Sequence, residues 1–320
     1  MNKDLTNTII FSGTANIALS TNIAATLQHR LGKIDVSSFS DNETCVELNE
    51  PVRKQSVFII QPTSAPANDN IMELLIIADA AKRSGASDII GVVPYYGYSR
   101  QDRRPSYSRV AITSKLVADL IESSGISQLV VVDLHSEQQQ GFFSIPVTNI
   151  SAMPIIVGDI WRKYQANINN VVIVSPDTGG VARARFIAKQ INDADLSIID
   201  KRRPSPNVSQ VMNVIGDVQG KDCIIVDDIV DTAGTLVKAA AALHEKGAAS
   251  VCAYATHGVL SGSAFDNIEN SILSEVVITD TILNIDIDSQ SKVRVISIAS
   301  LLAETIRRIH LGTSVSEICA

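Results

Sequence analysis

Short apolar runs recur along the whole chain, and most of them are continuous rather than alternating with polar residues. Continuous runs of this length are typical of strands in a parallel sheet, because helices cover both faces of such a sheet. We therefore predict an α/β fold in which mainly parallel sheets are flanked by helices, with right-handed crossovers. The apolar runs span residues 9–11, 57–60, 89–93, 129–132, 171–174, 196–199, 223–226, 251–253 and 276–278, and helical patterns span 71–83, 114–124, 181–191 and 236–246.

The same order of elements occurs twice. In each half, an apolar run and a helix precede a polar segment, FSDNE (39–43) or DKRR (200–203), and another apolar run follows. The next helices end in similar stretches, KRSGAS (82–87) and EKGAAS (245–250). We predict two homologous domains, 1–150 and 151–305, and a C-terminal segment, 306–320, that can pack back on the first domain. Chance similarity between βαβ units is the alternative.

Composition narrows the class of protein. The chain has 320 residues, of which 45% are hydrophobic and 19% charged, as in a globular protein of two domains. The net charge of -7 argues against nucleic acid as the main partner, although basic clusters at 100–104 and 201–203 suit a small anionic ligand. The sequence lacks a signal-peptide core and a membrane-spanning run, and its four cysteines lack metal or redox spacing. We expect a cytoplasmic protein without nucleic-acid or membrane partners.

An acidic turn follows the apolar run at 223–226. Backbone N–H groups and the helix dipole at a helix start favour a phosphate, and neighbouring carboxylates can accept hydrogen bonds from sugar hydroxyls. An N-cap role would explain one aspartate of this turn but not the adjacent pair. The segment therefore predicts a site for a phosphorylated sugar. Its polar and small residues are Asp227, Asp228, Asp231, Thr232, Ala233, Gly234 and Thr235, and an alanine-rich helix follows them.

This turn resembles the phosphoribosyl-diphosphate loop of the type I phosphoribosyltransferases. Other segments resemble the ribose-phosphate diphosphokinases, in one order over essentially the whole chain. The resemblance implies two tandem type I phosphoribosyltransferase-like domains. It also implies transfer of the diphosphoryl group of ATP to the anomeric hydroxyl of ribose 5-phosphate, giving 5-phosphoribosyl 1-diphosphate and AMP. The segments are FSDNE (39–43), APANDNIMELL (65–75), PYYGYSRQDRR (94–104), VDLHSEQQQGFF (132–143), SPDTGGVARAR (175–185) and DKRRP (200–204).

The resemblance also assigns ligands to residues. No GxxxxGK[ST] motif is present, so ATP is not held by a conventional P-loop. The resemblance implies instead that ATP is bound by Phe39, Asp41, Glu43, Arg100 and Gln101. It implies that Mg²⁺ is held by His135 and Asp177, that Lys201 and Arg203 are catalytic, and that Arg203 joins the acidic turn in binding ribose 5-phosphate. Without the resemblance, residues 39–43 would be interpreted as a surface turn, and His135 and Asp177 as hydrogen-bonded turn residues. Lys201 and Arg203 would be interpreted as part of a solvated basic turn.

Several further expectations depend on the same resemblance. Arg103, Arg104 and Arg109 lie in a polar stretch that forms either a solvated loop or a lid over ATP. Ala233 stands where the family usually has glycine, so a positive φ there would cost about 1–2 kcal/mol. Ala111 stands where proline is common. The resemblance implies a homo-oligomer, a hexamer, often activated by phosphate and inhibited by ADP. A catalytically silent regulatory subunit and a phosphoribosyltransferase are the alternative functions.

Overall fold

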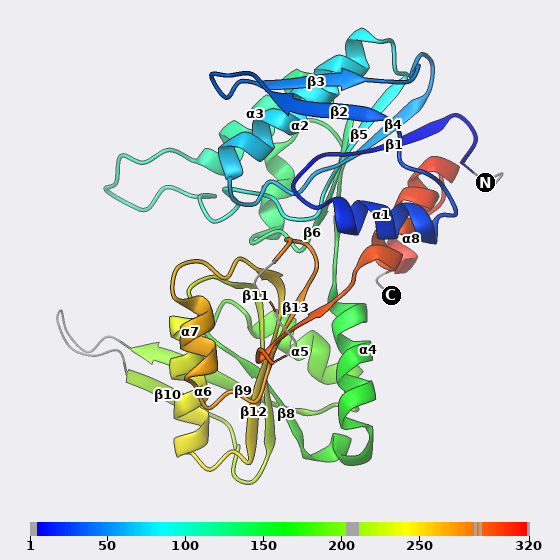
Figure 1. The fold of residues 1–320 in the computed structure, drawn as a ribbon. Helices are drawn as coiled ribbons and strands as arrows, with labels where there is room; N and C mark the ends of the chain where they lie inside the picture. Colours follow the sequence, from blue (N-terminus) through cyan, green and yellow to red (C-terminus); the bar gives the residue numbers. More distant parts are fainter. Residues whose placement is uncertain (1–4, 203–210, 285–286, 288–289, 319–320) are drawn as a thin grey trace. The chain divides into compact units, whose positions relative to one another are not determined.

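The computed structural model of the chain describes residues 5–202, 211–284, 287 and 290–318. These residues divide into two compact units, which are described separately (Figure 1). Unit 1 consists of Met1–Ser151, Thr281–Leu283 and Ser297–Ala320, and unit 2 of Ala152–Asp280 and Asn284–Ile296. None of the helices in this part of the chain has the length and apolar character needed to cross a bilayer.

The described part of unit 1 contains a five-stranded parallel sheet, in the order β1-β4-β5-β6-β7, and a separate antiparallel ribbon of β2 and β3. Its elements are β1 (Thr8–Ser12), α1 (Ile17–Thr26), β2 (Ile34–Ser38), β3 (Thr44–Leu48), β4 (Ser56–Ile60), α2 (Ala67–Arg83), β5 (Asp88–Val93), α3 (Thr113–Ser124), β6 (Gln128–Val132), η2 (Glu137–Phe142), β7 (Val147–Ile150), α8 (Ala299–Leu311) and η4 (Ser316–Ile318).

In unit 2 the described strands form a seven-stranded sheet, in the order β10-β9-β8-β11-β12-β13-β14, and only the β9–β10 pair is antiparallel. Its elements are α4 (Met153–Tyr164), η3 (Gln165–Asn170), β8 (Val171–Ser175), α5 (Val181–Gln190), β9 (Asp195–Arg202), β10 (Val211–Ile215), β11 (Asp222–Val230), α6 (Gly234–Glu245), β12 (Ser250–Gly258), α7 (Ala264–Glu269), β13 (Val276–Thr279) and β14 (Val293–Ile296).

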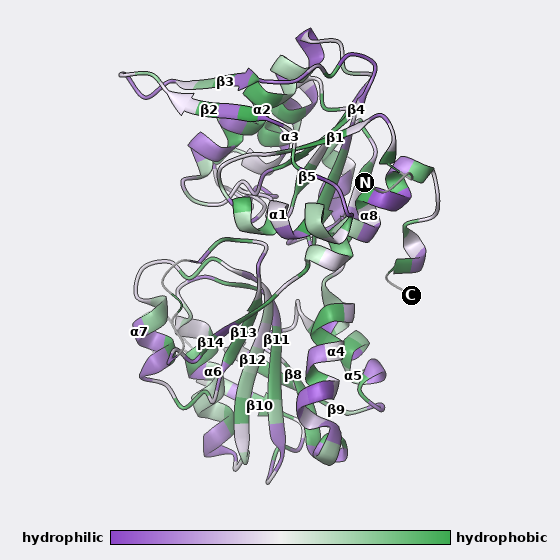
Figure 2. Ribbon diagram, turned by 45° about the vertical axis from the view of Figure 1, so that its right-hand side comes forward, coloured by the Kyte–Doolittle hydropathy of each residue, from purple (hydrophilic) through white to green (hydrophobic). Residues whose placement is uncertain are grey.

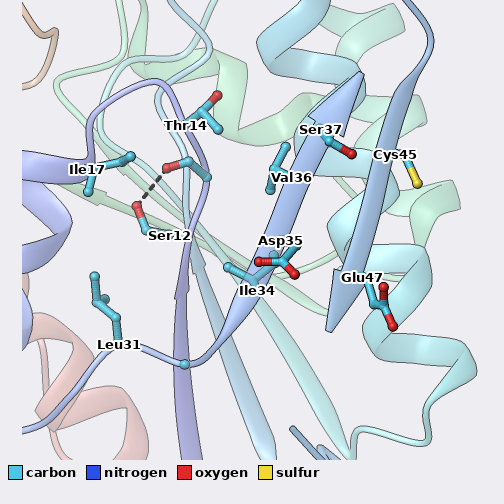
Figure 3. Close-up of a pocket in the computed structure, with 12 residues that line it drawn as sticks. Ser12, Thr14, Ile17, Leu31, Ile34, Asp35, Val36, Ser37, Cys45 and Glu47 are labelled. Carbon is cyan, nitrogen blue, oxygen red and sulfur yellow. Dashed lines mark hydrogen bonds between the residues drawn. The ribbon is translucent and has the colours of Figure 1, made fainter. Parts of the chain in front are cut away.

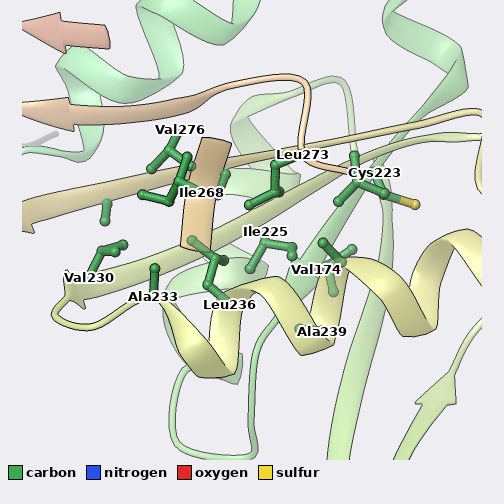
Figure 4. Packing of buried hydrophobic residues seen from close by; sticks show 14 of the residues in the cluster. Val174, Cys223, Ile225, Val230, Ala233, Leu236, Ala239, Ile268, Leu273 and Val276 are labelled. Carbon is green, nitrogen blue, oxygen red and sulfur yellow. The ribbon is translucent and has the colours of Figure 1, made fainter. Parts of the chain in front are cut away.

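The continuous apolar runs form the buried strands, as predicted, because both faces of each sheet are covered. In β11, Cys223 and Ile225 pack on one face with α6 and α7, whereas Ile224 and Val226 pack on the other face with α4 and α5. Figure 2 shows the hydrophobic strands at the centre of each unit and the hydrophilic residues on the outer sides of the helices. Figure 4 shows part of the α6 face, where Leu236 and Ala239 lie against strand residues.

The repeated order of elements is also confirmed. In each unit, a first strand and helix are followed by an antiparallel strand pair, β2–β3 or β9–β10, and then by a strand that lies beside the first, β4 or β11. FSDNE forms the turn between β2 and β3, and DKRR begins within β9. The two units differ in one respect that matters for the site. The pair β9–β10 joins the main sheet beside β8, whereas β2–β3 remains a separate ribbon.

The C-terminal helix α8 belongs to unit 1. It packs against α1, and His310 Nδ1 lies 2.8 Å from the hydroxyl of Thr8 on β1. Leu302 and Ile306 are fully buried on its inner side. The predicted C-terminal segment starts at residue 306, whereas the C-terminal portion of unit 1 starts earlier, at Ser297. Gly312 ends α8 in the left-handed conformation, with φ of 66°, which glycine adopts without a steric cost.

Candidate active site

The sheet of unit 2 has a topological switch point between β8 and β11. From β8 the chain runs to β9 on one side, and it later returns to place β11 on the other side. Ligands of open α/β sheets bind at such points, beyond the carboxyl ends of the strands. The last pair of residues that β11 shares with β8 is Ile225 and Val174. Asp227 and Asp228 therefore lie just beyond the end of β8, beside the loop that leaves it.

The guanidinium of Arg183 lies beside the acid pair. Arg183 is on α5, and its Nη1 is 3.5 Å from Asp227 Oδ1 and 3.3 Å from Asp228 Oδ1. The side chain of Asp228 is only 8% exposed, so an uncompensated charge there would be costly. Sequence reasoning missed Arg183. Its position eight residues after the end of β8 was the only signal, and that signal does not show which strand the arginine faces.

The two carboxylates are not equivalent. Burial raises the pKa of Asp227 to about 7, the Asp228 carboxylate acts in the same direction, and Arg183 opposes both. Asp227 Oδ1 also accepts a hydrogen bond from the backbone N–H of Asp228, at 2.9 Å. A carboxyl group with this pKa exchanges its proton near neutral pH. When ionised, it can accept a hydrogen bond from a sugar hydroxyl or bind a cation.

The acidic turn leads directly into α6, which begins at Gly234. Ala233 precedes the helix in the left-handed conformation, with φ of 59°, so the conformational strain predicted for this position is present. Ala233 is nevertheless buried, and its methyl group belongs to the core under α6 (Figure 4). Thr232 and Thr235 are exposed on either side of it. The first N–H groups of a helix have no partner within the helix, so this helix start favours an anion.

The loop after β8 lies on the other side of the switch point. Asp177 Oδ1 accepts hydrogen bonds from the N–H groups of Gly179 and Gly180, at 3.0 and 3.1 Å. Ser175 Oγ donates to the carbonyl of Asp177, at 2.6 Å. A side chain at Gly180 would place its Cβ 3.0 Å from Ser175 Oγ, so the compact loop favours glycine there. The carboxylate of Asp177 thus organises the loop in addition to any part it plays with a ligand.

The predicted catalytic pair is only partly within the described residues. Lys201 lies near the end of β9, where its backbone pairs with that of Met212 on β10. Arg203 lies outside the described residues. β9 is the strand next to β8, so the end of β9 and the switch point belong to the same edge of the sheet.

The predicted ATP residues lie in two loops of unit 1. Phe39, Asp41 and Glu43 are in the turn between β2 and β3. Phe39 is 58% exposed there, and Asp41 Oδ1 accepts a hydrogen bond from the N–H of Glu43. Arg100 and Gln101 follow β5 and are exposed. Gln101 Oε1 accepts from the hydroxyl of Thr113 at the start of α3, at 2.7 Å.

The polar stretch after Gln101 has no regular secondary structure up to α3. Arg103, Arg104 and Arg109 are exposed, and Arg104 Nε donates to the carbonyl of Ser108 within the same loop. Ala111 is exposed just before α3. This loop has the exposure that both a solvated loop and a lid require.

The two predicted metal ligands belong to different units. His135 is exposed in the loop after β6 of unit 1, and Asp177 is in unit 2. Among the described residues, no group of three histidine, cysteine, aspartate or glutamate side chains forms a ready-made metal cage. The carboxylates at the switch point are nevertheless of the type that Mg²⁺ prefers, since it takes oxygen ligands and keeps several waters. The acid pair, when ionised, therefore suits a cation brought with a phosphate ligand.

Unit 1 also contains a cavity of about 720 Å³ between the loop after β1 and the β2–β3 ribbon. Asp35 and Glu47 face each other across the ribbon, and Ser12 and Thr14 lie on the opposite wall (Figure 3). None of the residues predicted to bind ATP lines this cavity. The exposed loops, rather than the cavity, therefore remain the candidate site for ATP.

The fold and the switch-point loops together define a class. Two units with mainly parallel sheets, one of which carries a carboxylate pair and a helix start at its switch point, form a phosphoribosyltransferase-like α/β protein.

Comparisons with known proteins identify the family within this class. Residues 8–125 match the N-terminal domain of ribose phosphate pyrophosphokinase, and residues 197–319 match the phosphoribosyl synthetase-associated domain. The chain is 55% identical over 317 residues to a ribose-phosphate pyrophosphokinase of Xanthomonas axonopodis pv. citri, covering 99% of each chain. It is 54% identical over 313 residues to that of Bordetella pertussis, covering 98% of this chain and 100% of the relative.

A solved structure agrees with these relatives. The phosphoribosylpyrophosphate synthetase from Mycobacterium smegmatis superposes with a TM-score of 0.90 at 37% identity, over 96% of this chain and 100% of that one. The chain belongs to the ribose-phosphate pyrophosphokinase family. The predicted fold class and family are confirmed, and the chain is an enzyme of the diphosphoryl-transferring class.

Proposed function

We propose that this chain transfers the diphosphoryl group of ATP to the anomeric hydroxyl of ribose 5-phosphate, and that the switch point of unit 2 holds the sugar. The oxygen of the anomeric hydroxyl attacks the β-phosphorus of ATP. The bond from that phosphorus to the oxygen bridging it to the α-phosphate breaks, the hydroxyl loses its proton, and AMP leaves. Such a transfer depends on in-line positioning and on neutralising the spread negative charge. Membership of the family supports the reaction as a whole.

The observation that carries the sugar assignment is the sequence of groups from β11 into α6. The carboxylates of Asp227 and Asp228 can accept from the ribose hydroxyls, with Arg183 offsetting part of their charge. Four residues further on, the 5-phosphate can meet the N–H groups at the start of α6 and the hydroxyls of Thr232 and Thr235. One carboxylate pair and one helix start thus match the two ends of the same molecule.

ATP is assigned to the loops of unit 1. The exposed ring of Phe39 offers a stacking surface for adenine, and the carboxylates of Asp41 and Glu43 can accept from its exocyclic amine. Arg100 and Gln101 supply a cation and an amide for the phosphates. The arginines at 103, 104 and 109 can close over the nucleotide as a lid.

Lys201 and Arg203 are proposed as the catalytic pair. Cations that meet the diphosphoryl group while it moves between oxygens stabilise the transition state more than the bound substrates. Mg²⁺ is the proposed cofactor, and Asp177 and His135 are the residues that would hold it. When bound, it neutralises phosphate charge. We also propose a cytoplasmic homo-oligomer, with a hexamer as the assembly expected from the family.

The test is an assay of the purified chain with ATP, ribose 5-phosphate and Mg²⁺. AMP and 5-phosphoribosyl 1-diphosphate should appear in equal amounts, and AMP should not appear when ribose 5-phosphate is omitted. A silent regulatory subunit would give neither product. A phosphoribosyltransferase would consume 5-phosphoribosyl 1-diphosphate with a base instead. Asp231→Ala should then weaken ribose 5-phosphate much more than ATP, whereas equal weakening of both substrates would contradict the sugar assignment.

A further inference from the structure

The segment that follows β12 is bonded to the acidic turn along its length. The N–H groups of Val259 and Leu260 both donate to the carbonyl of Val230, at 2.9 and 3.1 Å, so the chain leaving β12 follows the end of β11. The hydroxyl of Ser261 then donates to Asp231 Oδ1. The segment after β12 thus contacts the acidic turn at Asp231, the first residue after β11.

The contact furthest along the turn comes from α7. Asn267 Nδ2 donates to the carbonyl of Thr232, at 2.9 Å, and lies 3.1 Å from Ser263 Oγ. The helix that carries it is anchored, because Ala264 and Ile268 on either side are fully buried in the core. The amide of Asn267 therefore reaches the turn from a fixed support.

The bonded carbonyl is the one that controls the conformation of Ala233. The torsion φ of Ala233 describes rotation of that residue relative to the peptide group that contains the Thr232 carbonyl. Ala233 has φ of 59°, which L-residues other than asparagine and aspartate rarely adopt. A hydrogen bond that holds the Thr232 carbonyl therefore opposes relaxation of Ala233 to a negative φ.

We propose that Asn267 is a positioning residue for the ribose 5-phosphate loop, and that it acts by holding the Thr232–Ala233 peptide in its strained conformation. This inference rests on the proposed sugar site. If Ala233 relaxed, the peptides before α6 would rotate and their N–H groups would no longer be aimed at the 5-phosphate. We call the hydrogen bond from Asn267 to the Thr232 carbonyl the clamp. Because glycine adopts positive φ without this steric cost, a chain with glycine at 233 would depend less on the clamp. The alanine at this position and the asparagine on α7 are thus functionally linked.

The experiment measures kcat and both KM values for Asn267→Ala. Losing one hydrogen bond to the loop should raise the KM for ribose 5-phosphate by about threefold to tenfold, with the KM for ATP changing less than about twofold. Asn270→Ala is the matched control, since Asn270 directly follows α7 and its side chain donates to the Asp266 carbonyl of that helix rather than to the acidic turn. This variant should leave both KM values unchanged. Asn267→Asp keeps the size and removes the donor, so it serves if the alanine variant does not fold.

The decisive comparison is a double-mutant cycle with Ala233→Gly. The effect of Asn267→Ala on the KM for ribose 5-phosphate should fall to less than about half in the Ala233→Gly background. An equal fold-change in both backgrounds, or an equal rise in both KM values, would overturn the clamp. Those outcomes leave the sugar assignment intact, because that assignment is tested separately by AMP formation and by the response to Asp231→Ala.

Discussion

Arg183 Nη1 lies 3.3 Å from Asp228 Oδ1, and this contact joins a helix to the strand end that carries the predicted sugar site. The same nitrogen lies 3.5 Å from Asp227 Oδ1, so one cation serves two adjacent carboxylates. The arrangement leaves the acid pair with excess negative charge. That excess keeps the pair ready to accept hydrogen bonds or a cation, while the arginine limits the cost of burying it.

Replacing Arg183 with glutamine should destabilise the folded protein. Asp228 would keep its buried charge without the cation, and hydrogen bonds to charged groups contribute about 1.5–3 kcal/mol. We expect a loss of about 1–3 kcal/mol in the free energy of unfolding, measured by urea denaturation at neutral pH. Arg185→Gln is the matched control, because Arg185 is exposed on the same helix and should change stability little. Equal stability of both variants would show that Arg183 does not support the acid pair.

The raised pKa of Asp227 predicts the sign of a pH effect. The folded protein holds this proton more tightly than the unfolded chain, so stability associated with Asp227 falls as pH rises from the ordinary value of 3.8 through about 7. Asp227→Asn removes the titration. The variant should therefore be relatively more stable than the parent at pH 8 than at pH 4, and its KM for ribose 5-phosphate should rise. Unfolding curves at both pH values provide the measurement, and a parallel pH dependence of the two proteins would contradict it.

Ala233→Gly should change stability little, because opposing effects nearly cancel. The substitution relieves about 1–2 kcal/mol of left-handed strain. It also loses a buried methyl group, worth about 0.8 kcal/mol, and adds about 0.5–1 kcal/mol of chain entropy. Ala240→Gly is the control, since Ala240 is fully buried in α6 and has no strain to relieve. We expect the control to be about 1–2 kcal/mol less stable than Ala233→Gly in thermal or urea unfolding. Equal losses would mean that Ala233 is unstrained.

The strands that sequence patterns predicted are those with continuous apolar runs, and each such run lies within a strand of the structure. The patterns missed β2, β3, β7, β10 and β14. These strands are partly exposed, so burial does not impose a clear apolar run on them. In β2, for example, Asp35 and Ser37 are exposed along a ribbon that lies outside the main sheet.

The candidate site was predictable only where its residues are adjacent in sequence. Asp227 through Thr235 form one segment, and its chemistry could be interpreted directly. Arg183 and Asn267 come from α5 and α7, and they meet that segment only because β11 lies beside both β8 and β12. Strand order depends on long-range pairing, which local patterns do not show. Side-chain contacts such as that between Asn267 and the Thr232 carbonyl follow from this order.

Lys201 and Arg203 provide the most direct prediction about catalysis. If both cations contact the diphosphoryl group in the transition state, each alanine substitution should lower kcat on the order of 10²–10⁵-fold, as for oxyanion donors and arginine fingers. The KM values for ATP and ribose 5-phosphate should change much less, because the ground-state contacts are assigned to other residues. Steady-state kinetics of Lys201→Ala and Arg203→Ala, after circular dichroism confirms that each variant is folded, provide the measurement. Arg202→Ala is the control, since it removes the same kind of charge from the same segment and should retain most of kcat. A near-parental kcat for Lys201→Ala and Arg203→Ala, or a loss confined to KM, would show that these two residues bind substrate or lie at the surface and do not stabilise the transition state.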